Sequence, residues 1–191
     1  MNRSMNTAIS IAAAGLSFVF AGQEAAAQQR PIETIDQTEM VRHLNTASID
    51  GALGVVTGNH VVTVDDAGQQ VISATATNGL QFEVRMTACA GSSPQDSETG
   101  ADTRECKALY VISVWEQIPS DRTADFSGVA GGYLIDHPTM NAGTLPDGRP
   151  YVVRYVIADY GTMQGNLVSE FANFIRGATA FQNAIAPLYT E

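Results

Sequence analysis

Residues 167–185, which read LVSEFANFIRGATAFQNAI, carry the clearest helical pattern in the chain. Their apolar side chains recur at steps of three and four, so they form one stripe along a helix. The stripe consists of Leu167, Phe171, Phe174, Ile175, Ala178, Phe181 and Ile185. Thr162 is placed to cap this helix, and Pro187 stops it. Because an aromatic stripe of this kind usually packs against a sheet, the sequence predicts a long C-terminal helix on one face of a sheet.

Several segments ahead of that helix are rich in β-branched residues or alternate between apolar and polar side chains, which is typical of strands. Asn78-Gly79 supplies a hairpin signal, because both residues tolerate the left-handed conformation of a type I′ turn. The strand after it has one apolar and one polar face, so it should be half-buried. The predicted strands are His60–Val64, Val71–Thr75, Leu80–Ala88, Ala108–Trp115, Tyr133–Ile135 and Tyr151–Ile157.

The strand Ala108–Trp115 differs from the others because it is apolar on both sides. Leu109, Val111 and Trp115 face one way, and Tyr110, Ile112 and Val114 face the other. This pattern predicts a central strand that is covered on both faces.

A first helix is predicted from Thr34, which can form a capping box with Gln37, to about Ala47. Its buried face would contain Ile35, Met40, Val41 and Leu44, and the turn Asp50-Gly51 would follow. The predicted order is therefore helix, strands, loop, strands, helix. This order indicates an α+β fold with a mainly antiparallel sheet of about five to six strands, packed by an N-terminal and a long C-terminal helix.

The segment between Pro119 and Gly132 leaves two interpretations open. Residues 121–126 can form one helical turn, but three glycines, Gly128, Gly131 and Gly132, argue against a long helix. The stretch from Asp136 to Pro150 contains three prolines and two glycines, which predicts a loop.

The first residues have the order of a secretory signal peptide, with Arg3, an apolar run from Ala8 to Phe20, and small residues before Gln28. The apolar run is too short to cross a bilayer, so we expect cleavage after about Ala27 rather than a membrane anchor. The expected organisation is a signal peptide at 1–27, a flexible leader at 28–33 and a single α+β domain at 34–191. The expected location is the periplasm or the medium.

The chain has 20 acidic and 10 basic residues and a formal net charge of −10. A surface this negative repels phosphate backbones and anionic lipid headgroups. The composition therefore argues against nucleic-acid and membrane-surface partners. After the signal peptide, no stretch of the sequence is long and apolar enough to span a membrane, so we expect no membrane insertion after signal cleavage. The composition leaves basic, amphipathic or uncharged partners open.

Cys89 and Cys106 are the only cysteines in the chain. Export would deliver them to an oxidising compartment, where a disulfide is expected. Such a bridge would tie the base of the long polar loop between them and stabilise the fold by roughly 3 kcal/mol. A redox pair is the alternative, but the two residues do not have the Cys-x-x-Cys spacing that usually marks one.

No segment has the pattern of a catalytic, cofactor or metal site. The three histidines, His43, His60 and His137, lie in different predicted elements and lack the close spacing of zinc ligands. No serine lies in a nucleophile elbow, and the glycine-rich GVAGGY at 128–133 lacks the flanks of a phosphate loop. The three carboxylates of residues 96–102 do not match a calcium loop. We therefore predict no catalytic residue, no cofactor and no metal.

Several of these features together resemble the YbjN-type domain, a family with a fold similar to type III secretion chaperones. The resembling features are the helix ending at Leu44, the turn Asp65–Gly68, the strand Leu80–Cys89, the segment Cys106–Leu109, the strand Gly132–Ile135 and the helix from Thr162. Members of the family often carry a Trp-Asn pair in a central helix, which residues 121–131 lack. The resemblance implies a non-enzymatic domain that binds other proteins, serves a regulatory role and forms a homodimer.

The leading hypothesis is an exported, chaperone-like protein-binding module with a basic or amphipathic partner. Its candidate binding surface consists of Phe171, Phe174, Tyr133 and Trp115. One alternative is a carrier for a small apolar ligand held between the final helix and the sheet. The other is an unrecognised hydrolase, because an active site need not leave a linear motif.

Overall fold

The computed structural model describes residues 30–65, 69–90 and 105–190. The predicted signal peptide, part of the turn Asp65–Gly68 and most of the loop before Cys106 lie outside these residues, and so do the carboxylates of 96–102. The helices are α1 (Thr46–Val56), α2 (Thr123–Asp136) and α3 (Gln164–Ile185), with 3₁₀ turns at η1 (Ile32–Thr34), η3 (Ser120–Arg122) and η4 (Ala186–Tyr189). The strands are β1 (Met40–Val41), β2 (Thr57–Val64), β3 (Gln70–Ala76), β4 (Gln81–Ala90), β5 (Glu105–Val114), β6 (Asn141–Thr144), β7 (Pro150–Ile157) and β8 (Thr162–Met163).

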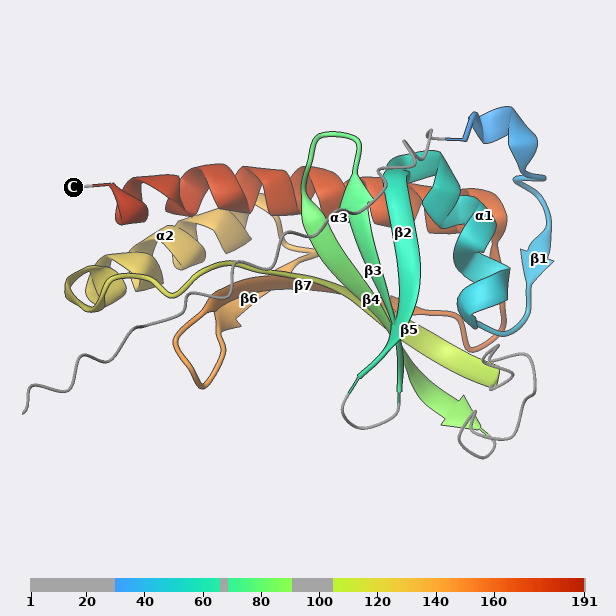
Figure 1. The fold of residues 1–191 in the computed structure, drawn as a ribbon, viewed down its shortest axis with the longest axis horizontal. Helices are drawn as coiled ribbons and strands as arrows, with labels where there is room; N and C mark the ends of the chain where they lie inside the picture. The colour runs from blue at the N-terminus through green and yellow to red at the C-terminus, as the bar shows by residue number, and fades with distance from the viewer. Residues whose placement is uncertain (1–29, 66–68, 91–104, 191) are drawn as a thin grey trace, which may run out of the picture.

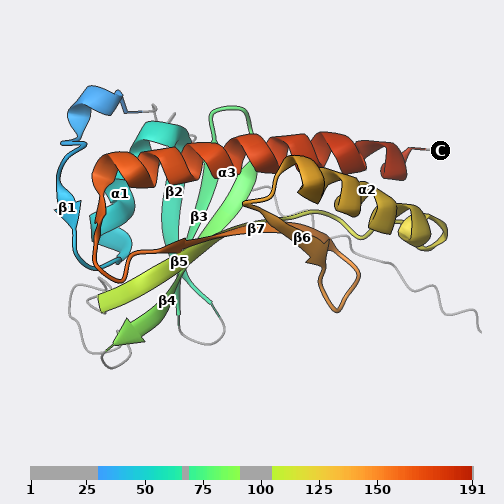
Figure 2. The same ribbon diagram turned by 180° about the vertical axis from the view of Figure 1, so that it is seen from behind.

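Six strands form one antiparallel sheet in the order β2-β3-β4-β5-β7-β6, and β1 pairs with β8 apart from it. Helix α3 runs across one face of this sheet. Helix α1 packs beside the N-terminal half of α3, and α2 packs beside its C-terminal half (Figures 1 and 2). The layer between α3 and the sheet contains the fully buried Phe171, Phe174 and Phe181. The prediction of an α+β fold with an antiparallel sheet and a long C-terminal helix is confirmed.

The N-cap of helix α3 is Met163, one residue after the predicted cap Thr162, and the helix begins at Gln164. Thr162 lies in β8, and the first turn of the helix has no side-chain cap. Instead, Gln164 N donates to Glu39 O and Gly165 N donates to Gln37 O, both at 3.0 Å. The N-terminal segment thus satisfies amides that a helix start leaves unpaired.

The predicted helix Thr34–Ala47 is wrong. This stretch forms η1, a turn and β1, and the first α-helix begins at Thr46. Asn45 Oδ1 accepts from Ser48 N at 2.8 Å, and Ser48 Oγ accepts from Asn45 N at 2.9 Å. This reciprocal capping box fixes the helix start, and the predicted Asp50-Gly51 turn lies inside α1.

The described part of the predicted flexible leader, from Arg30 onward, is held by α1. Arg30 N donates to Gly54 O at 2.7 Å, and Arg30 Nη1 lies 2.7 Å from Asp50 Oδ2. A Cβ at Gly54 would lie 2.8 Å from Arg30 Cδ, so the glycine leaves room for this side chain. Arg30 is therefore tied to α1 by a backbone hydrogen bond and an ion pair.

The hairpin predicted at Asn78-Gly79 is confirmed, but its type I′ geometry is wrong. Gly79 has φ of +86°, whereas Asn78 is not among the described residues with positive φ. Gly79 N donates to Ala76 O, and Ala76 N donates to Leu80 O, which makes a three-residue loop with a left-handed glycine. The Asn78 side chain donates to Thr179 Oγ1 of α3 at 2.8 Å, so the turn is held against the helix.

In the segment Pro119–Gly132, residues 120–122 form η3 and the helix α2 begins at Thr123. The predicted strand Tyr133–Ile135 is wrong, because these residues continue α2 to Asp136. Phe126, Ala130 and Tyr133 recur at helical spacing and are buried. Tyr133 donates from its hydroxyl to Gly177 O at 3.1 Å, and burial raises its pKa to about 12. Burial of these apolar side chains against α3 therefore outweighs the low helix propensity of the three glycines. The predicted loop after α2 also contains the edge strand β6.

Replacing the glycines of α2 with alanine is expected to stabilise the protein. A Cβ added at Gly128, Gly131 or Gly132 would meet nothing within 4 Å, and none of the three has positive φ. Each glycine-to-alanine change is therefore expected to raise the free energy of unfolding by about 0.5–1 kcal/mol. Urea unfolding of the three single variants and the triple variant measures this. Gly148→Ala, at a φ of +84°, is the matched control and is expected to destabilise.

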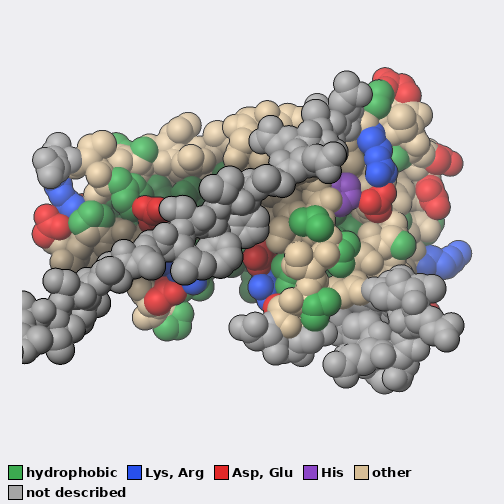
Figure 3. All heavy atoms as spheres, viewed as in Figure 1, with side chains coloured by type: hydrophobic (Ala, Val, Ile, Leu, Met, Phe, Trp, Pro, Cys, Tyr) green, Lys and Arg blue, Asp and Glu red, His purple; other side chains and the backbone are tan. Residues whose placement is uncertain are grey.

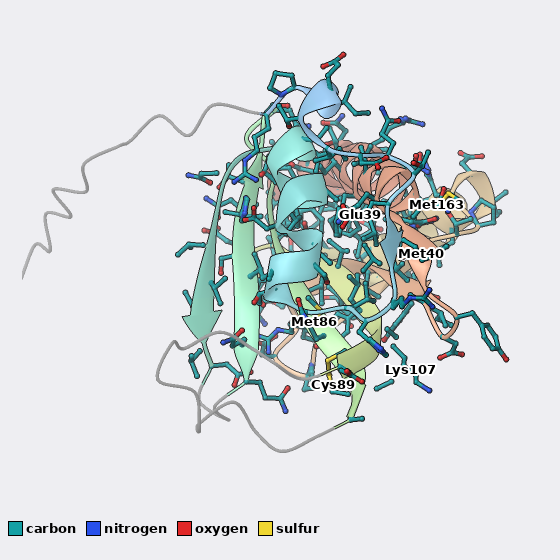
Figure 4. The ribbon with its side chains drawn as sticks, turned by 90° about the vertical axis from the view of Figure 1, so that its right-hand side faces the viewer. Glu39, Met40, Met86, Cys89, Lys107 and Met163 are labelled. Atoms are coloured by element: carbon teal, nitrogen blue, oxygen red, sulfur yellow. A yellow bond between two sulfur atoms is a disulfide. The ribbon has the colours of Figure 1, made fainter. Side chains whose placement is uncertain are left out.

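The predicted disulfide is confirmed by geometry. Cys89 and Cys106 face each other across β4 and β5, with an S–S distance of 1.99 Å. Figure 4 shows Cys89 and Lys107 at the same end of this hairpin. Leu44 also bonds to Cys106 through both backbone groups, at 2.8 and 3.1 Å, so the bridge lies where the N-terminal segment meets the sheet. A disulfide at this place is compatible with an oxidising compartment.

Candidate functional site

The face of the sheet opposite the helices is open, contrary to the expectation for β5. Leu109 and Val111 are fully buried under the helices. On the other face Tyr110 and Ile112 are partly exposed, and Val114 is 38% exposed. Among the described residues no helix packs on this second face. The two-sided apolar pattern therefore marks an exposed apolar surface instead of a second buried layer.

A groove of about 820 Å³ lies on this open face. Strands β2, β3 and β4 contribute mainly polar side chains, and β5 contributes mainly apolar ones. The polar residues include Asn59, Ser73, Thr75, Gln81, Glu83 and Arg85, and the β5 residues include Tyr110, Ile112 and Val114. Leu145 and Arg149 line it from the β6–β7 connection. Figure 3 shows hydrophobic and charged side chains next to each other on the part of this face that described residues form.

Charged groups meet at the polar half of the groove, where Glu83 and Arg85 line it and Asp65 pairs with Arg85. Arg85 Nη1 lies 2.8 Å from Asp65 Oδ2, and Arg85 Nε and Nη2 each lie 3.0 Å from Glu83 Oε2. Burial is the largest single effect and acts to lower the pKa of Arg85, but the hydrogen bonds and charges of Glu83, Tyr110 and Asp65 together outweigh it and raise that pKa. The guanidinium thus stays charged, and these three groups together carry one net negative charge.

Tyr110 borders these charged groups on the apolar side of the groove. Burial raises the pKa of Tyr110, although the Arg85 charge opposes the shift. Its hydroxyl therefore stays protonated near neutral pH and can donate a hydrogen bond. The Tyr110 ring lies 5.8 Å from that of Tyr155 on β7, which extends the apolar half to the neighbouring strand. Tyr155 and Ile157 on the same face are 59% and 72% exposed.

One arrangement at the rim of the groove has the composition of a hydrolytic triad. His60 Nε2 lies 2.8 Å from Asp50 Oδ1, and His60 Nδ1 lies 3.2 Å from Thr57 Oγ1. However, Thr57 is only 2% exposed, and its hydroxyl donates to Leu53 O at 2.7 Å. A nucleophile must reach its substrate, so this buried hydroxyl does not fit that role. The three side chains instead fasten β2 to α1.

The same geometry predicts a loss of stability in acid. Partial burial acts to raise the pKa of Asp50, but hydrogen bonds from His60 and Arg30 outweigh it and lower that pKa. A carboxyl with a lowered pKa stabilises the fold above its unfolded pKa of about 4, and this contribution disappears as pH falls through the folded value. Asp50→Asn is expected to cost about 1 kcal/mol or less at neutral pH, because the site is half-exposed.

Urea unfolding of Asp50→Asn and wild type between neutral pH and pH 3 tests this expectation. The difference between them should shrink as pH falls. Asp136→Asn is the matched control, since Asp136 is exposed and makes no ion pair among the described residues. A difference that stays constant with pH would contradict the assignment.

The predicted binding surface is wrong, because its residues belong to the core. Phe171 and Phe174 have no exposed area, and Tyr133 is 6% exposed. Trp115 is half-buried, and its ring lies 5.3 Å from that of Phe181. Since these rings pack between the helices and the sheet, they fill the layer where an apolar ligand was expected.

The histidines have separate packing or surface roles, as their scattered positions indicated. His43 Nε2 lies 3.6 Å from Glu105 Oε2 on the surface, and the His137 ring stacks on Tyr133 at 4.5 Å. Within the described ranges, no three His, Cys, Asp or Glu side chains gather as a metal site would require.

Sequence comparison adds no further assignment: no protein-family model matches the chain, and no curated protein is significantly similar to it. In the part of the chain that the structure describes, none of the helices combines the length and apolar character needed to span a membrane.

Glu83, Arg85, Tyr110 and the neighbouring Asp65 were not predicted as site residues. Two sequence patterns could have indicated them: the polar face of the strand Leu80–Ala88 and the second apolar face of the strand Ala108–Trp115. Only the pairing of Arg85 with Tyr110 across β4 and β5 shows that these two faces meet in one groove.

Proposed function

We propose that the protein is an exported, non-enzymatic binding module whose open sheet face receives a segment of a partner protein. The observation that carries this proposal is the groove on the face opposite the helices, polar over β2 to β4 and apolar over β5. Grooves with a mixed lining suit amphipathic segments, because each half can pair with one side of the segment. Two of the features that carried the resemblance to YbjN-type domains, the helix ending at Leu44 and the strand Gly132–Ile135, are not present in the fold, so the proposal rests on the groove.

The charge of the protein favours a basic partner. The chain has a formal net charge of −10, although the lining of the groove itself, with Glu83, Arg85 and Arg149, adds no negative charge to it. Complementary charge accelerates encounter and discriminates against acidic competitors. The segment expected in the groove therefore has apolar side chains on one side and Lys or Arg on the other. The periplasm or the medium remains the proposed location.

A small apolar ligand fits this geometry less well. The space beneath α3 is occupied by Phe82 and Phe174, whose ring centroids lie 5.7 Å apart. A carrier would have to use the open groove, where polar side chains line three of the four strands. A purified protein that carries extractable lipid would favour the carrier over the protein-binding module.

Tyr110→Ala tests the proposed groove. Proteins of the cell envelope that co-purify with wild type are identified by native mass spectrometry, and the segment they share is then titrated as a synthetic peptide. Loss of an aromatic anchor is expected to weaken that peptide at least about tenfold. Tyr160→Ala is the matched control, because Tyr160 is 99% exposed and outside the groove. Equal affinities of wild type and Tyr110→Ala, or a wild type without any partner, would count against the proposal.

A further inference from the structure

The edge strand β2 has the features of an interface. Among the strands that the structure describes, it pairs only with β3. Three of its valines are exposed: Val61 at 57%, Val62 at 46% and Val64 at 65%. Val61 pairs with Ser73 and therefore points to the open face, whereas Val62 pairs with Ile72 and points to the helix face. Apolar surface is thus exposed on both sides of one strand, and Figure 3 shows hydrophobic side chains along it.

The backbone of β2 also presents hydrogen-bonding groups at this edge. Asp65 N donates to Gln69 O at 2.9 Å, so these two residues form a hydrogen-bonded pair. Because such pairs alternate along an antiparallel ladder, Thr63 and Val61 also bond toward β3. The N–H and C=O groups of His60, Val62 and Val64 then point away from β3.

Natural proteins usually protect such an edge with charged residues, proline or a bulge. Residues 57–64 read TGNHVVTV and contain no Asp, Glu, Lys, Arg or Pro. The only irregularity in the register lies between Thr57 and Asn59, ahead of the valines. The exposed half of β2 is therefore a regular, uncharged strand.

We propose that β2 pairs antiparallel with β2 of a second copy of this chain, with Thr63 on the two-fold axis. This register places Val62 against Val64 of the other copy twice, which covers both valines on the helix face. It also uses the outward backbone groups of both residues. A two-fold contact requires a self-complementary surface, and a valine-rich strand without charge meets that condition. The two sheets then join into one continuous sheet, with their open faces on the same side.

The charge of the chain favours the edge of β2, rather than another surface, as the place where two copies make contact. Each chain has a formal net charge of −10, so two copies repel each other over most approaches. Contact through an uncharged strand adds no direct like-charge pair, and salt screens the remaining repulsion. Association is therefore expected to strengthen as ionic strength rises.

The first test is sedimentation equilibrium of wild type and Val62→Lys over a concentration series. Val62→Lys is expected to raise the dissociation constant of the dimer at least about tenfold, because two ammonium groups would enter the contact. Val114→Lys is the matched control, since Val114 is similarly exposed at 38% but lies on the central strand β5. Circular dichroism verifies that each variant is folded.

A second variant tests the register independently of any effect on folding. Thr63→Cys places two thiols across the axis, within the Cα separation that disulfides accept. Mild oxidation is expected to give a covalent dimer, whereas Thr139→Cys, at an exposed turn, is expected to stay monomeric. A wild type that is monomeric at every concentration and salt level would overturn the proposal, as would a dimer that Val62→Lys leaves intact. Either result leaves the groove proposal standing, because Val62 and Val64 point to the helix face and do not line the groove.

Discussion

Phe181→Ala is expected to lower the free energy of unfolding by about 3–5 kcal/mol, the usual cost of removing a buried aromatic ring. Phe181 is fully buried, and its ring lies 4.9 Å from Tyr133, 5.3 Å from Trp115 and 6.3 Å from Phe126. The ring thus joins α3 to α2 and to the end of β5. Its loss would leave a cavity at the point where three elements meet.

Urea unfolding followed by the fluorescence of Trp115, the single tryptophan, measures this effect. Phe181→Leu should recover most of the stability, because it keeps most of the apolar volume. Tyr160→Ala, at a side chain that is 99% exposed, should change stability by no more than about 0.5 kcal/mol. If Phe181→Ala behaved like Tyr160→Ala, the aromatic cluster would not be a core.

Replacing both cysteines with alanine is expected to lower the free energy of unfolding by about 3 kcal/mol. Cys89 and Cys106 are separated by 17 positions, and closing a loop of this size restricts the unfolded chain by about that amount. Because Cys106 has no exposed area, the lost sulfur packing adds to the cost. For a domain of this size, the melting temperature should fall by about 6–12 °C.

Reduction offers the control for this prediction. A reducing agent should destabilise wild type by a similar amount and leave the double variant unchanged. Equal melting temperatures for oxidised and reduced wild type would show that the bridge does not stabilise the fold.

The periodic parts of the fold could be predicted from the sequence. The stripe from Leu167 to Ile185 predicted α3, and the alternation after Gly79 predicted the half-buried β4, because each element buries one face against a single partner layer. The disulfide followed from two cysteines in an export context. These features depend on local sequence and on one kind of contact.

The elements that the sequence analysis misjudged depend on distant contacts. The glycines of α2 disfavour a helix locally, but burial of Phe126 and Tyr133 against α3 outweighs them. Residues 34–44 have apolar spacing near that of a helix, yet their backbone pairs with β8 and with Cys106. A strand that is apolar on both faces is read as covered on both, and only the positions of the helices show that one face of β5 stays open.

The candidate site was hidden for the same reason. Arg85 and Tyr110 come from strands separated by the long segment between the cysteines. Their contact depends on the β4–β5 register.

Helix α2 lies beyond the strands that form the groove and packs mainly on α3 and on the edge strand β6 (Figure 1). Its three glycines lower its intrinsic helical preference, and Phe181 supplies much of its anchorage. We therefore expect the free energy of local unfolding to be lower for α2 than for the opposite end of the molecule, which holds α1 and the disulfide. Helix α2 could then unfold locally as one cooperative unit while the strands that form the groove stay folded.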